Sequence, residues 1–553
     1  MTTNKLIKVK IYNFGEYEVF SGTTVIDLLE SLQLDLKYTV VAVSIDNNIT
    51  HLNTVMDKDM EIKLIDTSSA AGFRNYGRSA TFILMKATRD LFPNRQVIVK
   101  HSLSNGLYCE FYDVDTNAEE VGQLEKKMHE IVSMDIPIKK LIMPKEEAVN
   151  IFKRQKEYDK VDLLAHIDKK EIHVYELDGF YEYFHGNMVP KTSMVKKFRL
   201  ISYSHGLILQ IPQIEDPSIL KPYIEQKKLA GIFREAKEWA DMLETPHVAA
   251  LNGMIEQEKI NEIIQVNEAL HEKKIALIAD EICHDSNKRI ILISGPSSSG
   301  KTTFAQRLLI QLRVNGRRPV SISLDNYFVD RPLTPKDEDG NLDFEALEAI
   351  KLDLFNDHLT KLLKGEEVEV PVFNFIEGRA EPNGALIKVP VGEPIILEGI
   401  HALNDKLTYR IPTINKYNIY VSALTQLNID YTNRIPTTDC RLLRRMVRDN
   451  RTRGIDAIST INRWASVRRG EEKNIFPFQE NADVMFNTSL VYELAIIKPL
   501  AEQLLRAIGP GSEEYAEARR LLKFLSYFKP IEADGIPPNS ILREFIGGSC
   551  FKH

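Results

Sequence analysis

The feature that most constrains this chain is a glycine-rich stretch that follows an apolar run at residues 290–293. Gly295, Gly300, Lys301 and Thr302 match the pattern G-x-x-x-x-G-K-[ST]. The apolar run predicts a buried strand, and apolar residues at helical spacing from 303 to 314 predict a helix. A strand, a loop and a helix in this order form a phosphate-binding loop, where backbone N–H groups and the positive helix N-terminus surround a phosphate.

Each residue of this loop has an expected role. Lys301 would reach the β- and γ-phosphates of a nucleoside triphosphate, and the Thr302 hydroxyl would ligate Mg²⁺. The alternative is an ordinary Gly/Ser-rich turn between a strand and a helix. We therefore expect the chain to bind ATP and Mg²⁺, with the nucleotide held by Gly295, Ser297, Ser298, Ser299, Gly300, Lys301, Thr302 and Thr303.

The length and composition restrict the setting of this loop. A chain of 553 residues predicts three or four domains at ~100–200 residues each. The net charge of −7 argues against bulk nucleic-acid binding, although a local basic surface is compatible with it. No apolar run approaches the ~20 residues that span a membrane, and the four cysteines show no paired spacing. We expect a cytoplasmic protein without a membrane partner.

Residues 1–66 predict a compact unit of two strands, a helix and two further strands. This order is typical of a β-grasp fold, and it resembles the TGS domain of threonyl-tRNA synthetases. The resemblance implies a link to RNA or nucleotide regulation. Residues 4–66 carry six Lys/Arg and ten Asp/Glu, a net charge of −4, whereas phosphate-backbone affinity comes from basic groups. A regulatory or scaffolding role is therefore favoured over RNA binding.

Residues 67–235 continue this resemblance, since residues 78–93 look like the helix of the second additional (editing) domain of threonyl-tRNA synthetases. That domain carries an H-x-x-x-H pair and a later C-x-x-x-H pair. Here these positions are Arg78, Phe82, Phe184 and Met188. The resemblance implies a retained fold whose editing chemistry is lost.

Two further segments show no sign of chemistry of their own. Residues 236–287 predict a helical connector, because their apolar stripe at helical spacing is typical of core packing. Residues 508–553 predict a helical tail that either packs on the preceding domain or mediates oligomerisation.

Two carboxylates follow predicted strands in residues 288–507. Asp325 ends a strand that we expect to lie next to the phosphate-loop strand, where it would accept the proton of an attacking hydroxyl. Glu398 ends another buried strand and would lie near Mg²⁺. The alternatives are a capping aspartate and a surface glutamate.

A cluster of arginines follows. Arg441, Arg444, Arg445 and Arg448 are spaced to share one helix face, and residues 439–473 carry ten Lys/Arg against five acids. Arginines beside a phosphate-binding loop can stabilise a transferring phosphoryl group from a closing lid. We expect Lys301, Asp325, Arg444 and Arg448 to be catalytic. An RNA-facing or solvated helix would look similar in isolation.

Taken together, these motifs in residues 288–500 resemble the uridine kinase/phosphoribulokinase family of P-loop kinases. The resemblance implies that Asp325 activates a sugar hydroxyl and that Glu345 contacts the ribose. It implies an acceptor site formed by Asp325, Tyr327, Glu345, Phe373, Arg379 and Arg441. Uridine kinases use a tyrosine and a histidine to recognise the base, whereas this chain has Phe373 and no histidine there. A site that lacks these hydrogen-bond partners would discriminate the base poorly.

The predicted fold class is a multidomain α/β and α+β protein: a β-grasp (1–66), an editing-like α+β domain (67–235), a helical connector (236–287), a P-loop kinase with a parallel sheet (288–507) and a helical tail (508–553). The predicted function is ATP-dependent phosphorylation of a nucleoside 5′-hydroxyl, with uridine or cytidine first. Another acceptor, or an RNA- or nucleotide-sensing regulator, remains open. The expected partner is a small nucleoside-like acceptor. RNA is not favoured, and homo-oligomerisation is undecided.

Overall fold

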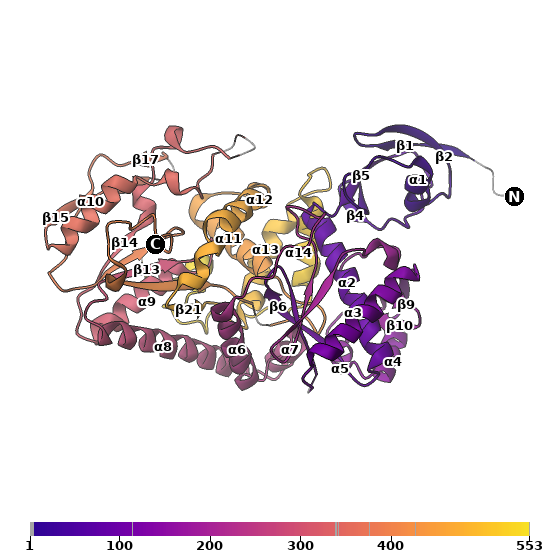
Figure 1. Cartoon of the computed structure of the whole chain (residues 1–553), viewed down its shortest axis with the longest axis horizontal. Coiled ribbons are helices and arrows are strands. Elements are labelled where there is room, and N and C mark those ends of the chain that lie inside the picture. Colours follow the sequence, from indigo (N-terminus) through magenta and orange to yellow (C-terminus); the bar gives the residue numbers. More distant parts are fainter. Residues whose placement is uncertain are drawn as a thin grey trace.

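The computed structural model describes residues 5–112, 114–337, 340, 342–374, 377–425 and 427–551. It is the α/β and α+β multidomain protein that the sequence predicts, with the units arranged along one long axis (Figure 1). The β-grasp unit lies at one end, the parallel sheet of the kinase-like unit lies at the other, and helices α13 and α14 lie between them.

The N-terminal unit is a five-stranded sheet in the order β2-β1-β5-β3-β4, with β1 and β5 parallel. Alternating apolar residues on β1, among them Ile7, Val9 and Ile11, face the helix and form the core of this unit. The Thr24 side chain caps α1 by accepting from the Asp27 N–H. The elements are β1 (Leu6–Ile11), β2 (Gly15–Phe20), α1 (Val25–Leu32), β3 (Val40–Ile45), β4 (Asn48–Thr50) and β5 (Met60–Asp66).

The second unit contains two antiparallel sheets around the long, mostly buried helix α2. One sheet has the order β11-β12-β7-β6 and the other β10-β9-β8. The elements are α2 (Ala70–Leu91), β6 (Val97–Leu103), β7 (Gly106–Phe111), α3 (Ala118–Ser133), β8 (Lys139–Pro144), α4 (Lys145–Gln155), α5 (Tyr158–Ala165), β9 (Glu171–Leu177), β10 (Phe180–Glu182), β11 (Arg199–Tyr203) and β12 (Gly206–Gln210).

Three helices follow: α6 (Lys227–Met242), α7 (Val248–Glu256) and α8 (Ile260–His284). The expected boundary between residues 235 and 236 falls inside α6. The longest helix of the expected connector is α8. Buried residues of α7 and α8 share one apolar core with the second unit, the kinase-like unit and the tail. The helices therefore join the front units to the kinase-like unit through packing.

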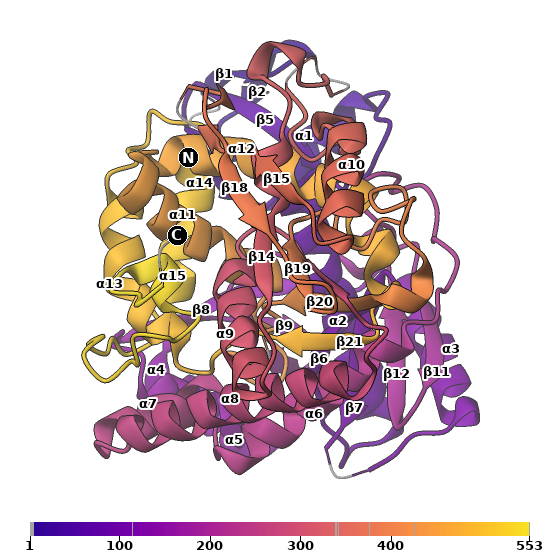
Figure 2. The same cartoon turned by 90° about the vertical axis from the view of Figure 1, so that its left-hand side faces the viewer.

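The kinase-like unit is built on a parallel sheet in the order β14-β19-β13-β20-β21, with α8 and α9 packed together beside it (Figure 2). All five residues of β13 are buried, because helices and neighbouring strands cover both of its faces. The sheet strands are β13 (Ile290–Ser294), β14 (Val320–Ser323), β19 (Ile395–Glu398), β20 (Lys416–Ser422) and β21 (Val484–Asn487).

The remaining elements surround that sheet or form small hairpins above it. They are α9 (Lys301–Val314), α10 (Leu352–Leu363), β15 (Glu367–Val370), β16 (Phe373–Asn374), β17 (Arg379–Ala380), β18 (Ala385–Lys388), α11 (Thr437–Arg453), α12 (Ala457–Asn474), α13 (Glu493–Arg506), α14 (Tyr515–Leu525) and α15 (Arg543–Ile546). Tail residues such as Leu521, Phe524 and Phe545 are buried in the shared core, so the tail packs on the kinase-like unit. None of the helices formed by the described residues could span a membrane.

A buried charge cluster ties the second unit to the kinase-like unit. The Lys160 ammonium lies 3.0 Å from Glu182, 3.3 Å from Asp159 and 3.5 Å from Asp430, and all four side chains are nearly inaccessible. Burial alone would lower the pKa of Lys160, but the surrounding carboxylates raise it well above its ordinary value. Burial likewise raises the pKa of Glu182. The ammonium is therefore needed to compensate buried negative charge.

Replacing Lys160 by methionine should destabilise the protein strongly. Lys160→Met leaves acidic groups buried without their counter-charge, and removing one partner of such a cluster costs ~3–5 kcal/mol. Urea unfolding followed by circular dichroism measures the loss. Lys153→Met removes an exposed lysine of α4 and should change stability by no more than ~0.5 kcal/mol. Equal stability of both variants would contradict the role given to Lys160.

Candidate active site

The predicted phosphate-binding loop joins β13 to α9 at the carboxyl edge of the parallel sheet. Glycine is required at position 295 because a Cβ there would overlap the Val421 carbonyl oxygen. Gly300 has φ +84°, a left-handed conformation that glycine adopts without strain, and it is the residue before the first turn of α9. The residues expected to hold the nucleotide thus form one continuous turn into a helix N-terminus.

This turn has unused hydrogen-bonding capacity. The Ser298 and Ser299 hydroxyls are buried and have no hydrogen-bond partner within the described residues. The Lys301 ammonium donates to the Gly295 and Pro296 carbonyl oxygens at 3.0 and 3.1 Å. Burial lowers the pKa of Lys301, against the opposing effect of Glu398 and Asp325. Orphaned hydroxyls beside a desolvated ammonium are groups that a phosphate would satisfy.

Two carboxylates of the chain already accept N–H donors of this region. Glu471 of α12 accepts from the Ser297 N–H at 3.0 Å. Glu544 of α15 accepts from the Thr303 N–H at 3.2 Å and from its hydroxyl at 2.9 Å. Ile541 lies against Gly300. In this conformation the tail therefore places a negative charge at the N-terminal turn of α9, a position that favours anions.

Sequence reasoning missed both of these glutamates. Glu471 entered only as one acid in a charge count, and the tail carried no recognised motif. A carboxylate of the tail can be assigned to the loop only when the tertiary packing of α15 is known.

Asp325 and Glu398 lie at the same edge of the sheet. Ser323, the last residue of β14, pairs with Glu398, and Glu398 pairs with Ile293 of β13. The expectation that the strand ending at Asp325 lies next to the phosphate-loop strand is wrong, because β19 is inserted between β14 and β13. This order places Glu398 closer to the phosphate-binding loop and Asp325 on its far side.

The two carboxylates influence each other electrostatically. Burial and the charge of Asp325 raise the pKa of Glu398 to about 7. Burial also raises the pKa of Asp325, against the opposing charges of Lys301, Arg453 and Arg448. The Ser323 hydroxyl donates to Glu398 at 2.9 Å.

These carboxylates fit a divalent cation, because carboxylate oxygens are ligands that Mg²⁺ prefers. Burial disfavours the ionised forms of both acids, and a bound Mg²⁺ would stabilise those forms. Among the described residues there is no cluster of three or more His, Cys, Asp or Glu that could hold a metal by itself. A cation at Thr302 and Glu398 would therefore need ligands from a phosphate or water.

The four arginines of α11 differ in their surroundings. Arg441 pairs with Glu471 and donates to the Ser297 carbonyl oxygen at 3.0 Å. Arg445 donates to the Ser297 hydroxyl at 2.9 Å. Arg444 is fully buried in an ion pair with Glu493 and packs on the Phe545 ring. Three side chains of the stripe thus support the loop or the tail.

Arg448 is the fourth of these arginines. It pairs with Asp449 at 2.8 Å, and its charge acts on both Asp325 and Lys301. Arg453, at the end of α11, also acts on Asp325. Arg453 was counted in the basic segment by sequence but not chosen as a site residue.

The residues expected to bind the acceptor are spread over different environments. Tyr327 is buried, with its hydroxyl 3.2 Å from His358 Nδ1, so it belongs to the core. Glu345 packs on Gly470, and burial raises its pKa to about 7 against the charge of Arg445.

Phe373 contacts Phe328, while Arg379 lies on an exposed hairpin and pairs with Glu377 at 2.9 Å. The structure brings Asp325 and Glu398 together with Lys301, and it does not bring Arg379 into that group.

Comparison with known proteins gives two different resemblances. Residues 290–494 match the Phosphoribulokinase / Uridine kinase family. The N-terminal region matches threonine–tRNA ligases, with 27% identity over 196 residues to the enzyme of Francisella tularensis subsp. tularensis (strain FSC 198). That match covers 35% of this chain and 31% of the ligase, so the chain spans about a third of the length of the curated relatives it matches.

Solved structures give weaker likenesses. A possible uridine kinase from Bacillus stearothermophilus is 17% identical, with a TM-score of 0.28 over 39% of this chain and 98% of that chain. A proposed fructose transport system kinase from Silicibacter sp. TM1040 is 18% identical, with a TM-score of 0.29 over 38% of this chain and 98% of that chain. Such low scores carry no conclusion about the substrate.

Removing the tail carboxylate should strengthen phosphate binding at the loop. Glu544→Gln removes the negative charge of the carboxylate that accepts from Thr303. Mg-ATP should therefore bind roughly tenfold more tightly, which corresponds to ~1.4 kcal/mol of binding free energy. Isothermal titration calorimetry measures the affinity. Glu532→Gln removes an exposed tail carboxylate and serves as the matched control. Equal affinities of the parent and Glu544→Gln would show that Glu544 does not oppose the nucleotide.

Proposed function

We propose that residues 288–507 transfer the γ-phosphoryl group of ATP to a hydroxyl of a small acceptor, and that this acceptor is the 5′-hydroxyl of a nucleoside, with uridine or cytidine first. The convergence of Lys301, Asp325 and Glu398 at one edge of a parallel sheet carries the proposal. The family match over residues 290–494 supports a kinase-type phosphotransferase.

In this proposal the loop from Gly295 to Thr303 surrounds the phosphates of ATP. Lys301, freed from its two carbonyl partners, neutralises the charge of the transferring group, and Arg448 adds positive charge from α11. Mg²⁺ bound at Thr302 and Glu398 would supply charge neutralisation of the phosphate oxygens. Arg441 and Arg444 act by holding α11, since each is paired with a buried carboxylate.

Asp325 is the proposed general base. It follows β14, on the far side of Glu398 from the loop strand, at the carboxyl edge where ligands bind in open α/β sheets. Its raised pKa makes the carboxylate a better proton acceptor than an exposed aspartate, while Lys301, Arg448 and Arg453 keep it from rising further.

The base of the acceptor would meet few hydrogen-bonding side chains. Phe373 lies where the family's base-recognising tyrosine is expected, and Tyr327 is committed to the core. An acceptor site with few hydrogen-bonding groups for the base supports a broad acceptor range, including another nucleoside, a nucleotide or a sugar phosphate.

A second candidate function is favoured by one observation. Glu471 and Glu544 accept N–H groups of the loop region that a nucleotide would otherwise use. A protein whose loop is closed in this way fits a nucleotide-sensing regulator that opens the tail when a nucleotide binds. Such a regulator would bind Mg-ATP but show no acceptor-dependent turnover.

Measurement of ADP release from Mg-ATP with a panel of nucleosides, nucleotides and sugar phosphates distinguishes these functions. Turnover with uridine or cytidine that is lost in Lys301→Ala supports the nucleoside kinase. Turnover only with another acceptor keeps the phosphotransferase and changes its substrate. Mg-ATP binding without turnover for any acceptor favours the regulator.

Asp325→Asn should lower turnover by ~10²–10⁴, because general-base catalysis contributes about that factor. The substitution keeps the shape of the side chain and removes its basicity, so Mg-ATP affinity should change little. Steady-state kinetics with the best acceptor measure kcat. Asp353→Asn alters an aspartate of α10 whose side chain is 94% exposed and should leave kcat unchanged. Normal turnover in Asp325→Asn would remove Asp325 from the mechanism.

A further inference from the structure

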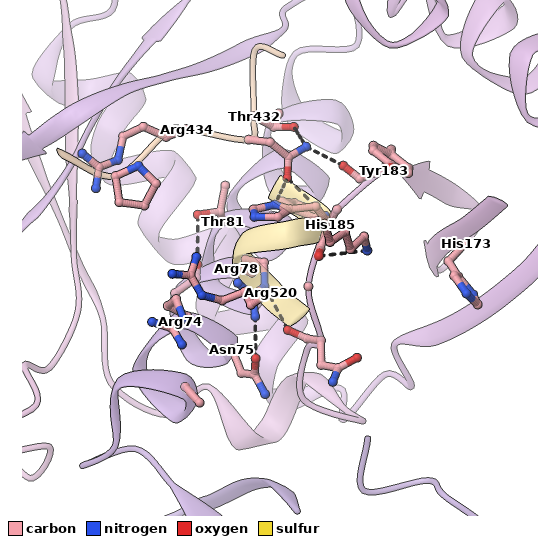
Figure 3. Close-up of a pocket in the computed structure, with 18 of the residues that line it drawn as sticks. Arg74, Asn75, Arg78, Thr81, His173, Tyr183, His185, Thr432, Arg434 and Arg520 are labelled. Carbon is pink, nitrogen blue, oxygen red and sulfur yellow. Dashed lines mark hydrogen bonds between the residues drawn. The ribbon is translucent and has the colours of Figure 1, made fainter. Parts of the chain in front are cut away.

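A large basic cavity lies between the second unit and the tail, away from the phosphate-binding loop. Its volume is about 800 Å³, and it is enclosed by α2, residues 183–187, residues 432–436 and α14. Eight Lys/Arg and three Asp/Glu line it, an excess of five positive charges in a chain whose net charge is −7. Figure 3 shows Arg74, Arg78 and Arg520 gathered together, with Arg434 on the segment beside them.

Part of this charge is already compensated within the protein. Arg520 forms a two-bond pair with Asp439 at 2.6 and 2.8 Å and also contacts Glu517 at 2.6 Å. Arg74 lies 2.9 Å from Glu517. The two arginines and two carboxylates therefore compensate one another's charge.

The other cations lack such compensation. In the part of the chain that the structure describes, Arg78, Arg434 and Lys523 have no carboxylate within ion-pair distance. Arg78 donates to the Asn187 carbonyl oxygen at 2.9 Å, and Lys523 donates to the His185 carbonyl oxygen at 3.0 Å. No hydrogen bond is formed by Arg434 with any described residue. Three desolvated cations therefore line one cavity without a carboxylate in contact with them among the described residues.

Desolvation lowers the pKa of all three groups, and repulsion by neighbouring cations lowers the pKa of Arg78 and Lys523 as well. Burial first, and then the charges of Arg74 and Arg520, lower the pKa of Arg78 to about 9. Burial, then Lys140, Lys169 and Arg78, lower the pKa of Lys523 to about 8. Burial lowers the pKa of Arg434 to about 10, against the opposing charge of Asp439. An anion bound in the cavity would relieve this unfavourable charge.

The cavity also offers neutral hydrogen-bond donors and an apolar surface. Asn75 is 3% exposed, and its Nδ2 has no partner among the described residues, while its Oδ1 accepts from Arg78. Arg78 thus fixes the orientation of the amide, and the Nδ2 donor is left unpaired. Phe184 lines the cavity, with Phe82 packed behind it at 5.7 Å. A ligand with an organic part as well as negative charge matches this lining.

The positions expected to correspond to the editing site converge beside this cavity. Phe82, Phe184 and Met188 share one buried cluster, and Arg78 lies against Gly186. The described residues contain no His/Cys/Asp/Glu cluster that could hold a metal. The four positions expected to carry the polar editing residues are therefore occupied by three apolar side chains and the Arg78 guanidinium.

We propose that this cavity binds a small organic molecule that carries at least two phosphate groups. Arg78, Arg434 and Lys523 would neutralise the phosphates, and Asn75 would donate to one of their oxygens. RNA is a weaker candidate, because the chain is acidic overall and its N-terminal unit is acidic as well, so the positive charge is concentrated in the cavity instead of following a strand path.

Inorganic tripolyphosphate tests the proposal in the full-length chain. Lys301→Ala removes the loop lysine, so that the kinase-like site contributes less to binding, and calorimetry then measures the affinity of the cavity. Adding Arg434→Gln should weaken binding roughly tenfold or more, because a charge-assisted contact is lost. Arg434 makes no hydrogen bond with the described residues, so this variant should fold normally. Arg506→Gln, at a side chain 69% exposed on α13, is the matched control.

The outcomes separate cavity binding from its alternatives. Tripolyphosphate binding that Arg434→Gln weakens and Arg506→Gln leaves intact supports the proposal. Undetectable binding, or equal weakening by both substitutions, overturns it. Pocket-dependent binding of a ten-nucleotide RNA together with undetectable tripolyphosphate binding also overturns it, in favour of RNA. Because the readout is direct binding, failure of the proposed kinase activity would not affect this result.

Discussion

Helix α11 depends on one physical constraint: each charged side chain that it buries must meet an opposite charge. A desolvated guanidinium without a partner costs several kcal/mol. Helix α11 buries Asp449, which pairs with arginines of α11 itself. It also buries Arg441, Arg444 and Asp439. Their partners come from three other elements: Glu471 of α12, Glu493 of α13 and Arg520 of α14. These pairs fix the position of α11 relative to the phosphate-binding loop on one side and the basic cavity on the other.

This arrangement explains why the arginines on one face of α11 contribute little unpaired charge to the candidate active site. Positive charge on one helix face could indicate a lid, but two of these side chains bond the loop directly and one is paired in the interior. The charge that acts on Asp325 comes from Lys301, Arg448 and Arg453. Arg441 and Arg445 thus bond Ser297 of the loop, while the tail carboxylate Glu544 accepts from Thr303 at the start of α9.

In the second unit, the side chains at the expected editing positions differ in polarity from those of the editing domain that it resembles. The positions expected to carry polar editing groups now include three apolar side chains that complete a core. Arg78 occupies the fourth position. It lines a cavity together with residues 432–436 and residues of α14, which lie outside the second unit. The cavity therefore belongs to the assembled chain, and its charge arises from segments that are far apart in the sequence.

The sequence by itself determined the local elements and the phosphate-binding loop. Apolar periodicity fixed β13, α9 and the N-terminal strands, since burial of one face depends on residues close in the chain. The glycines at 295 and 300 were readable because the backbone there tolerates no Cβ or needs a positive φ. The carboxylates Asp325 and Glu398 were found because they follow buried strands.

Only the tertiary structure decided the rest. The insertion of β19 between β14 and β13, the docking of Glu544 on Thr303 and the meeting of Arg78, Arg434 and Lys523 all join residues separated by tens to hundreds of positions. Local patterns carry no information about such pairs, because strand order and helix docking are set by the packing of whole elements.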